Sequence, residues 1–116
     1  MIPATNRFRG SRLIELVYKR GRAARVDFLS AKAVTPKTGS YKLAVVVSKK
    51  ISKSAVVRNK IRRRIFEQFR EIFKEKGAPK IDIVVSVYDE RAAKVPAGEL
   101  RKMCEKLLEK LESRLK

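Results

Sequence analysis

The stretch KKISKSAVVRNKIRRRIFEQFR, residues 49–70, decides the fold expected for this chain, because it combines a helical pattern with an unusual charge pattern. On a helical wheel that starts at Val57, the large apolar residues here and just beyond fall on one side. These are Ile61, Ile65, Phe69, Ile72 and Phe73. The spacing predicts an amphipathic helix from about Ser54 to Glu75 whose apolar side packs on a sheet. Gly77 and Pro79 mark its end.

The cations of this helix are concentrated in its N-terminal half. Residues 49–64 contain eight lysine or arginine residues and no acid. The helix macrodipole is positive at that end, so each cation there costs on the order of 0.3–1 kcal/mol. Arg63 and Arg64 have an acid at helical spacing, whereas Arg58, Lys60 and Arg62 have none. A charged helix face is most often simply solvated, but unpaired cations at the unfavourable end indicate a surface that binds phosphate.

The net charge of the whole chain follows the same asymmetry. The 116 residues carry a formal net charge of +18, with a pI near 10.6. Residues 1–66 hold 18 lysines and arginines against two acids, whereas residues 67–116 hold 12 against 10. An external polyanion is the simplest counter-charge. We favour nucleic acid over a membrane surface and expect no membrane partner, because the apolar residues follow ordinary globular patterns.

Outside this helix the patterns predict an α/β layer fold in a single domain, residues 1–116, with a basic arm over residues 1–10. We expect a first helix over residues 11–21, strands over residues 25–34, 41–47 and 81–87, a short extra strand near residues 22–24, and a last helix over about residues 100–115. The turn PKTGS, residues 36–40, should join the first two long strands as a hairpin. The run LAVVV, residues 43–47, is apolar on both faces, which is typical of a central strand.

Two of the predicted elements leave alternatives open. In the first helix, Ile14 and Tyr18 lie beside the apolar stripe, where they either complete the core or line a groove in which an unpaired base stacks. In the strand over residues 25–34, the side chains of Phe28, Ser30 and Lys32 share a mixed face, which is either solvent-facing or ligand-facing.

The composition excludes several classes of enzyme. The chain has no histidine, which removes Ser/His/Asp and Cys/His catalysis together with the commonest metal ligand. The acids near a strand end, Asp82, Asp89 and Glu90, leave an intrinsic metal-dependent nuclease formally open but disfavoured. The single cysteine, Cys104, lies on the apolar stripe of the last helix and should be a buried structural thiol. With no signal-peptide pattern and no apolar run that could span a bilayer, the expected location is the cytoplasm.

The segment AVVRNKIRR, residues 55–63, with Lys49-Lys50-Ile51 before it, resembles the RNR signature of the bacterial ribonuclease P protein component. The sequence YKRG, residues 18–21, the chain length and the order of elements are also similar to that family. The resemblance implies an α+β two-layer sandwich of order αβββαβα, with a central four-stranded sheet and a left-handed βαβ crossover. It also implies that the protein assists a catalytic RNA in the endonucleolytic removal of the 5′ leader from precursor tRNA, with Mg²⁺ bound mainly by the RNA.

The resemblance further assigns residues to two surfaces. The surface that contacts the catalytic RNA would hold Lys49, Lys50, Lys53, Arg58, Asn59, Lys60, Arg62 and Arg63. The cleft for the single-stranded leader of precursor tRNA would hold Phe8, Ile14, Tyr18 and Phe28. The chain departs from the family pattern at Arg62 and Phe66, where lysine and arginine are frequent. A ribosomal or other structural RNA-binding protein on a similar scaffold is the alternative.

Overall fold

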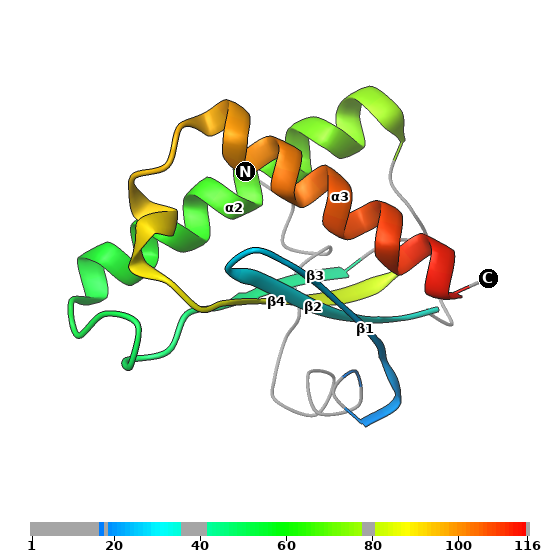
Figure 1. The fold of residues 1–116 in the computed structure, drawn as a ribbon, viewed down its shortest axis with the longest axis horizontal. Helices are drawn as coiled ribbons and strands as arrows, with labels where there is room; N and C mark the ends of the chain where they lie inside the picture. Colours follow the sequence, from blue (N-terminus) through cyan, green and yellow to red (C-terminus); the bar gives the residue numbers. More distant parts are fainter. Residues whose placement is uncertain (1–16, 18, 36–41, 78–80, 116) are drawn as a thin grey trace.

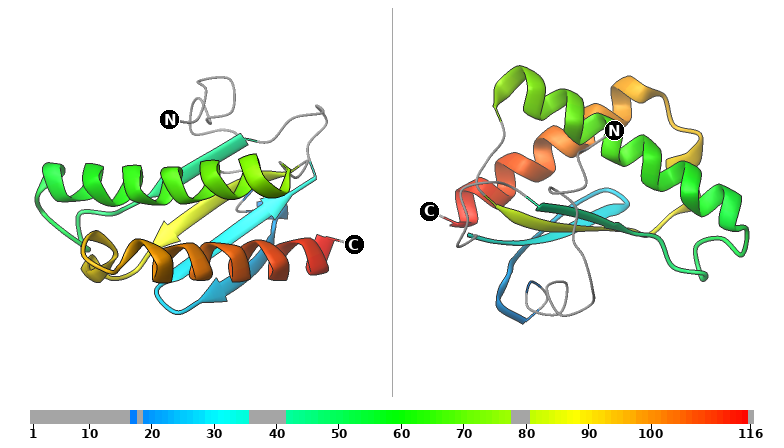
Figure 2. Two further views of the ribbon diagram at one scale, coloured as in Figure 1. Left: turned by 90° about the horizontal axis from the view of Figure 1, so that it is seen from above. Right: turned by 180° about the vertical axis from the view of Figure 1, so that it is seen from behind.

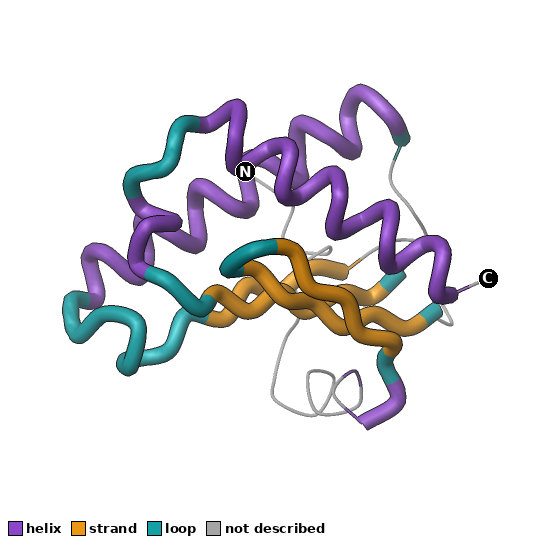
Figure 3. Tube along the Cα trace, viewed as in Figure 1, coloured by secondary structure: helices purple, strands orange, loops and turns teal. Residues whose placement is uncertain are grey.

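The computed structural model describes residues 17, 19–35, 42–77 and 81–115. The elements in chain order are β1 (Arg22–Val26), β2 (Leu29–Val34), β3 (Lys42–Val46), α2 (Ala55–Lys76), β4 (Asp82–Val87), the 3₁₀ helix η2 (Glu90–Ala93) and α3 (Ala97–Leu115). The strands form one sheet, and both α2 and α3 cover the same face of it (Figures 1 and 3). The α/β class and the two-layer arrangement are therefore confirmed.

The strand order of the sheet is β1-β2-β4-β3, which corrects the predicted hairpin. The segment over residues 25–34 is not one strand, because Asp27 has a φ of 52° and reverses the chain. A short polar residue such as aspartate tolerates this left-handed conformation better than most side chains do. The short strand expected near residues 22–24 thus becomes β1, and β1 and β2 form the hairpin. The next neighbour of β2 is β4, in antiparallel register.

The strand β3 lies at the edge of the sheet, so the prediction that LAVVV forms a central strand was wrong. Its burial alternates, with Leu43 and Val45 buried towards the helices and Ala44 and Val46 only half-buried. The central apolar strand is β4, in which Ile83, Val84 and Val85 are buried in succession. A continuous apolar run shows that a strand is well covered, but it does not show how many neighbours the strand has.

The connection from β3 through α2 to β4 joins two parallel strands. Figure 2 (left) shows the molecule from the helix side, with α2 in front of the sheet. When this view is turned so that β3 and β4 point upward, β4 lies to the left of β3. This crossover is left-handed, as the family resemblance implied, against the strong general preference for right-handed connections.

The helix α2 begins and ends where the sequence predicted. The Ser54 hydroxyl oxygen accepts a hydrogen bond from the backbone N–H of Val57 at 3.3 Å, which makes Ser54 the N-cap. At the other end Gly77 has a φ of 86°, a value that favours glycine, and its N–H donates to the Phe73 carbonyl at 2.9 Å. The predicted apolar stripe is buried between them: Ile61, Ile65, Phe69, Ile72 and Phe73.

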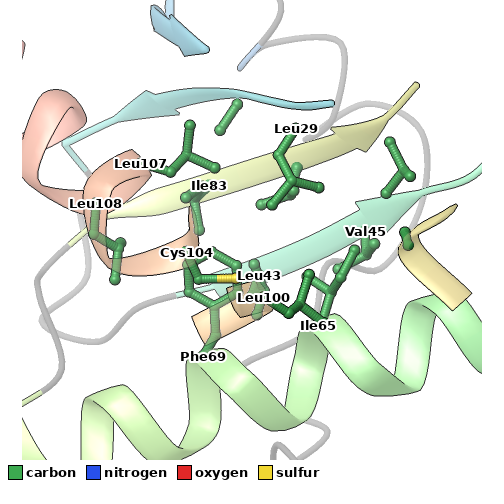
Figure 4. Close-up of a cluster of buried hydrophobic side chains, with 14 of the residues drawn as sticks. Leu29, Leu43, Val45, Ile65, Phe69, Ile83, Leu100, Cys104, Leu107 and Leu108 are labelled. Carbon is green, nitrogen blue, oxygen red and sulfur yellow. The ribbon is translucent and has the colours of Figure 1, made fainter. Parts of the chain in front are cut away.

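The core lies between this stripe, the sheet and α3. Figure 4 shows Phe69 and Ile65 of α2 facing Leu43 and Ile83 of the sheet, with Cys104 of α3 among them. As predicted, Cys104 is a buried thiol, and burial raises its pKa to about 12. The thiol is therefore protonated and inert in the folded protein at neutral pH.

The C-terminal half of α3 is tied to β1 by two long cations. The Lys110 ammonium donates to the Arg25 carbonyl at 3.0 Å, and the Arg114 guanidinium donates to the Ala23 carbonyl.

Within the described ranges, no helix is long and apolar enough to cross a membrane.

Little of the predicted first helix falls within the described residues. Val17, Lys19 and Arg20 are helical, and the Gly21 N–H donates to the Val17 carbonyl at 2.7 Å. A Cβ at Gly21 would lie 2.3 Å from that carbonyl oxygen, so only glycine fits. This turn lies on the opposite side of the sheet from α2 and α3 (Figure 1). Phe8, Ile14 and Tyr18 lie outside the described residues.

Candidate nucleic-acid interface

The eight residues assigned to the RNA-facing surface come from one continuous piece of structure, the loop before α2 and the first three turns of that helix. We call this surface the basic end of α2: Lys49, Lys50, Lys53, Arg58, Asn59, Lys60, Arg62 and Arg63. All are exposed except Arg58 and Arg62, which are half-buried. The structure therefore brings these predicted residues together, because the buried stripe of α2 turns its opposite side outwards.

The loop and the helix start are held in place by hydrogen bonds from side chains. The Arg58 guanidinium donates to the Ser52 carbonyl at 2.9 Å, and the Ser52 hydroxyl accepts from the Ser54 N–H at 3.2 Å. Arg58 thus folds back over the loop and fixes it against the first turn of α2. The lysines of the loop are presented from an ordered base, so fewer backbone conformations have to be lost when they meet a ligand.

Asn59 and Arg62 form a pair on the outer side of α2. The Arg62 guanidinium donates to the Asn59 side-chain oxygen. That contact occupies one lone pair of the Asn59 side-chain oxygen, and the NH₂ group remains as a donor beside the guanidinium. The pair presents mainly hydrogen-bond donors, which suits phosphate and carbonyl oxygens.

The basic end of α2 has no internal counter-charge in the part of the chain that the structure describes. None of its cations forms an ion pair there, and the first turn of α2 contains no acid. The acids of the helix lie later and have other partners. Glu67 and Glu71 both accept from the Arg70 guanidinium, each at 2.9 Å, and the hydrogen bond from Arg70 lowers the pKa of Glu67.

Arg63 and Arg64 do not form the ion pairs that their spacing to Glu67 and Glu71 allowed. The Arg64 guanidinium instead donates to the carbonyls of Ala92, at 2.7 Å, and Val95. Arg64 therefore connects α2 to η2 and is not available to an external phosphate. A helical wheel misses this contact, because the carbonyls belong to a segment that is distant in the sequence.

A hollow of about 460 Å³ lies between the basic end of α2 and the segment around η2. Val57 and Lys60 line it from α2, and Arg91 and Lys94 line it from the η2 side. Neither Arg91 nor Lys94 was among the site residues predicted from the sequence. The sequence indicated them only by their position just after a predicted strand. They lie in the C-terminal half of the chain, where positive and negative charges are nearly balanced. Two acids, Asp89 and Glu90, line the same hollow, and Asp89 pairs with Arg91 at 2.8 Å, so the charge on the η2 side is partly compensated.

Phe28 is the one predicted leader-cleft residue that the structure describes. Its side chain is only 5% exposed and belongs to the core, at the turn between β1 and β2. The Arg91 guanidinium carbon lies 5.5 Å from the centre of the ring. Phe28 therefore supports a cation at the surface, and its contact with a leader stays a prediction.

The described acids do not provide a metal site. No group of three or more histidine, cysteine, aspartate or glutamate side chains gathers within the described ranges. Asp82 is the first residue of β4, and burial raises its pKa. Asp89 caps η2 by accepting from the Arg91 N–H at 2.9 Å, and its pKa is lowered by that bond.

Comparison with known proteins places these features in context. A family model described as Ribonuclease P matches residues 2–112. The ribonuclease P protein component of Pseudanabaena sp. is 36% identical over 76 residues, which are 65% of this chain and 66% of that relative. The RNase P protein from Thermotoga maritima has a TM-score of 0.71 at 26% identity, over 92% of this chain and 96% of that one. The RNase P protein of Staphylococcus aureus shares the fold, with a TM-score of 0.78 at 23% identity over 95% and 96%.

Proposed function

Because this chain belongs to the ribonuclease P protein family, the non-catalytic protein subunits of a ribonucleoprotein endoribonuclease, we propose that the basic end of α2 binds the catalytic RNA of that enzyme. The single observation that carries this assignment is the absence of ion pairs to these cations among the described residues. Phosphate groups would supply the missing counter-charge. The arginines would contact them in pairs of hydrogen bonds, and the loop lysines would act as point charges.

The second part of the proposal concerns the substrate. The 5′ leader of precursor tRNA would pass over a cleft that includes Phe8, Ile14, Tyr18 and Phe28, and the RNA would cleave at the end of that leader. The support for this part is the resemblance of the YKRG sequence, residues 18–21, together with the buried Val17 and the close approach of Gly21 to β2. These contacts hold the end of the first helix against the sheet, on the face opposite α2.

Mg²⁺ would be held by the RNA. The described side chains do not fit a protein site for this ion, since their acids are scattered and several already pair with arginine. A cation bound by the RNA and a cation of the protein would neutralise the same phosphates, so each would partly replace the other. We also propose the cytoplasm as the location, because a lone thiol is typical of a reducing compartment.

The test uses holoenzyme reconstituted from catalytic RNA and the double variant Arg58→Gln/Arg62→Gln. We expect leader removal at low Mg²⁺ to fall by about tenfold or more, since two charge-assisted contacts are lost. At high Mg²⁺ the activity should recover to within about twofold of the parent, because ions replace the missing charge.

The matched control is Lys102→Gln/Lys106→Gln on α3, which removes the same number of positive charges, here from exposed side chains. It should leave the Mg²⁺ dependence unchanged. If both double variants shift the Mg²⁺ dependence equally, net charge and not the basic end of α2 is responsible. If neither does, the assignment is wrong, and an RNA-binding role elsewhere, such as on the ribosome, becomes the better explanation.

A further inference from the structure

Tyr88, directly after β4, is the one aromatic side chain that is exposed in the part of the chain that the structure describes. It is 53% exposed, whereas Phe28, Phe69 and Phe73 are buried and Phe66 is half-buried. Its hydroxyl has no hydrogen-bond partner among the described residues. An exposed aromatic ring is not unusual by itself, so its surroundings decide whether it has a role.

The surroundings of Tyr88 hold the ring in a defined position. The Tyr88 backbone N–H donates to the Phe28 carbonyl at 2.9 Å, which continues the pairing of β4 beside the β1–β2 turn. The Arg25 guanidinium carbon lies 5.2 Å from the centre of the Tyr88 ring. The Arg25 backbone is held in turn by Lys110, which donates to its carbonyl at 3.0 Å. The ring and the cation are thus attached to rigid parts of the fold.

The pair lies on the face of the sheet opposite α2 and α3. Arg25 pairs in register with Ser30, and Ser30 pairs with Ser86. These positions alternate with the buried Ala31 and Val85, which face the helices. Tyr88 is two residues after Ser86, so strand alternation points its side chain to the same side as Arg25, as their contact requires.

The charge of Arg25 is also uncompensated. Its Nε donates to the Asp27 backbone carbonyl at 3.4 Å, not to a carboxylate, and within the described ranges Arg25 forms no ion pair. A cation beside an aromatic ring is the combination with which proteins bind single-stranded nucleic acid, in which the ring stacks on a base and the cation meets a phosphate.

We propose that Tyr88, backed by Arg25, is a stacking platform for one unpaired base of bound RNA. The inference rests on the RNA-binding role proposed above and adds a contact outside the basic end of α2. The base belongs either to the leader of precursor tRNA or to an unpaired segment of the catalytic RNA, and the ring recognises both by the same chemistry. Stacking tolerates any base, so the platform would add affinity for unpaired RNA and little sequence preference.

The chain contains no tryptophan, so Tyr88→Trp introduces a single fluorescent reporter at the proposed platform. We expect an unstructured eight-nucleotide RNA to quench this fluorescence on saturation, and a duplex of equal length to leave it unchanged. The control is Ser113→Trp, on the exposed side of α3, which neither RNA should quench. If the fluorescence of the Tyr88→Trp variant stayed unquenched in saturated complexes, the proposal would be overturned.

The affinities of Tyr88 variants for the same single-stranded RNA distinguish stacking on the ring from hydrogen bonding by its hydroxyl. Tyr88→Ala and Tyr88→Leu should each weaken RNA binding by about tenfold. This loss lies near the low end of the range for base–aromatic stacking, because the ring is only half exposed. Tyr88→Phe should stay within about twofold of the parent, because it keeps the aromatic face. Equal losses for phenylalanine and alanine would also overturn the proposal, since the hydroxyl would then be the important group.

The source of the base follows from the fluorescence of the Tyr88→Trp variant in the full complex. Quenching by catalytic RNA alone assigns the base to that RNA, whereas quenching only by precursor tRNA, and not by mature tRNA, assigns it to the leader. If this fluorescence were unchanged while Arg58→Gln/Arg62→Gln still showed its Mg²⁺ effect, the platform alone would be rejected. Loss of that Mg²⁺ effect would reject the proposed function instead.

Discussion

The two halves of α2 share one buried stripe but differ in how their charges are neutralised. In the C-terminal half the acids meet nearby cations: Glu67 and Glu71 pair with Arg70, and Glu75 pairs with Arg101 of α3. In the N-terminal half the cations have no acid among the described residues. The same helix therefore contains one region whose charges are largely compensated within the protein and one whose cations have no ion-pair partner among the described residues. The packing of a helix does not determine its surface chemistry.

The two halves also differ in how their cations interact with the helix macrodipole. Placing cations at the N-terminus of a helix opposes the macrodipole, whereas Lys74 and Lys76 in the last turn of α2 complement it. Exposed ion pairs contribute little to stability, so the C-terminal half gains only modestly from its network. The stability of both halves comes mainly from the buried stripe.

The largest effect should come from the stripe, where the two halves are alike. Phe69 is fully buried beneath the middle of α2. Phe69→Ala should lower the free energy of unfolding by about 3–5 kcal/mol, from lost burial and the cavity that remains. Urea denaturation measures this loss. Val56→Ala is the control, because that side chain is 75% exposed and should change stability by less than about 0.5 kcal/mol. A similar loss in both variants would show that the stripe does not carry the fold.

A smaller effect is expected on the salt dependence of RNA binding, which should change when cations are removed from the N-terminal half of α2 but not when they are removed near its C-terminal half. Lys60→Gln/Arg63→Gln removes two exposed cations from the basic end of α2. Each lost phosphate contact should reduce the slope of log affinity against log salt by about 0.7–0.9. The comparison variant is Lys74→Gln/Lys102→Gln, which removes two exposed cations near the compensated half and should keep the parent slope. Equal slopes for the two variants, measured by filter binding over a salt series, would abolish the distinction between the halves.

The smallest effect is expected on the pH dependence of stability, to which the ion pairs of the C-terminal half of α2 contribute. Arg101 donates to Glu75 and to Glu105, and Lys76 also donates to Glu105 at 2.7 Å. Arg101 lowers the pKa of Glu75, and Lys76 followed by Arg101 lowers that of Glu105. Because these folded-state pKa values lie below the unfolded ones, the contribution is present at neutral pH and disappears as the pH falls through the folded values.

Arg101→Gln should therefore lower the melting temperature by a few degrees at most at pH 7. The difference from the parent should shrink as the pH falls below the usual glutamate range, and thermal denaturation at several pH values measures it. A difference that grew towards acid pH would contradict the lowered pKa values. RNA affinity should remain that of the parent, because Arg101 is directed towards acids of its own fold.

The local features of α2 were predictable from sequence, whereas the turn at Asp27 and the pairing of the strands were not. The stripe, the Ser54 cap and the Gly77 end of α2 each depend on residues a few positions apart, so a helical wheel finds them. The edge position of β3 depends on which strands pair across the sheet. The apolar composition of β3 does not indicate how many strands it pairs with. The family resemblance supplied the left-handed crossover, which general preferences would have assigned the other way.

The same division holds for the candidate site. Its eight polar residues form a continuous segment, so the sequence could group them. The helical spacing of Arg64 to the acids of α2 gave no sign of its actual acceptors, the carbonyls of Ala92 and Val95, which follow β4 in the chain. Tyr88 and Arg25 meet only because β1, β2 and β4 lie side by side, so no local pattern could have paired them.

The contacts of Lys110 and Arg114 with β1 have a consequence for how the protein behaves before it meets RNA. An edge strand offers unpaired carbonyls to any other extended chain, which is a common route to aggregation. At Ala23 and Arg25 these acceptors are already occupied by side chains of α3. The long cations also surround that edge with positive charge, so a second copy of the molecule would be repelled from it. A protein awaiting its RNA is thereby hindered from adding its own sheet to that of a neighbour.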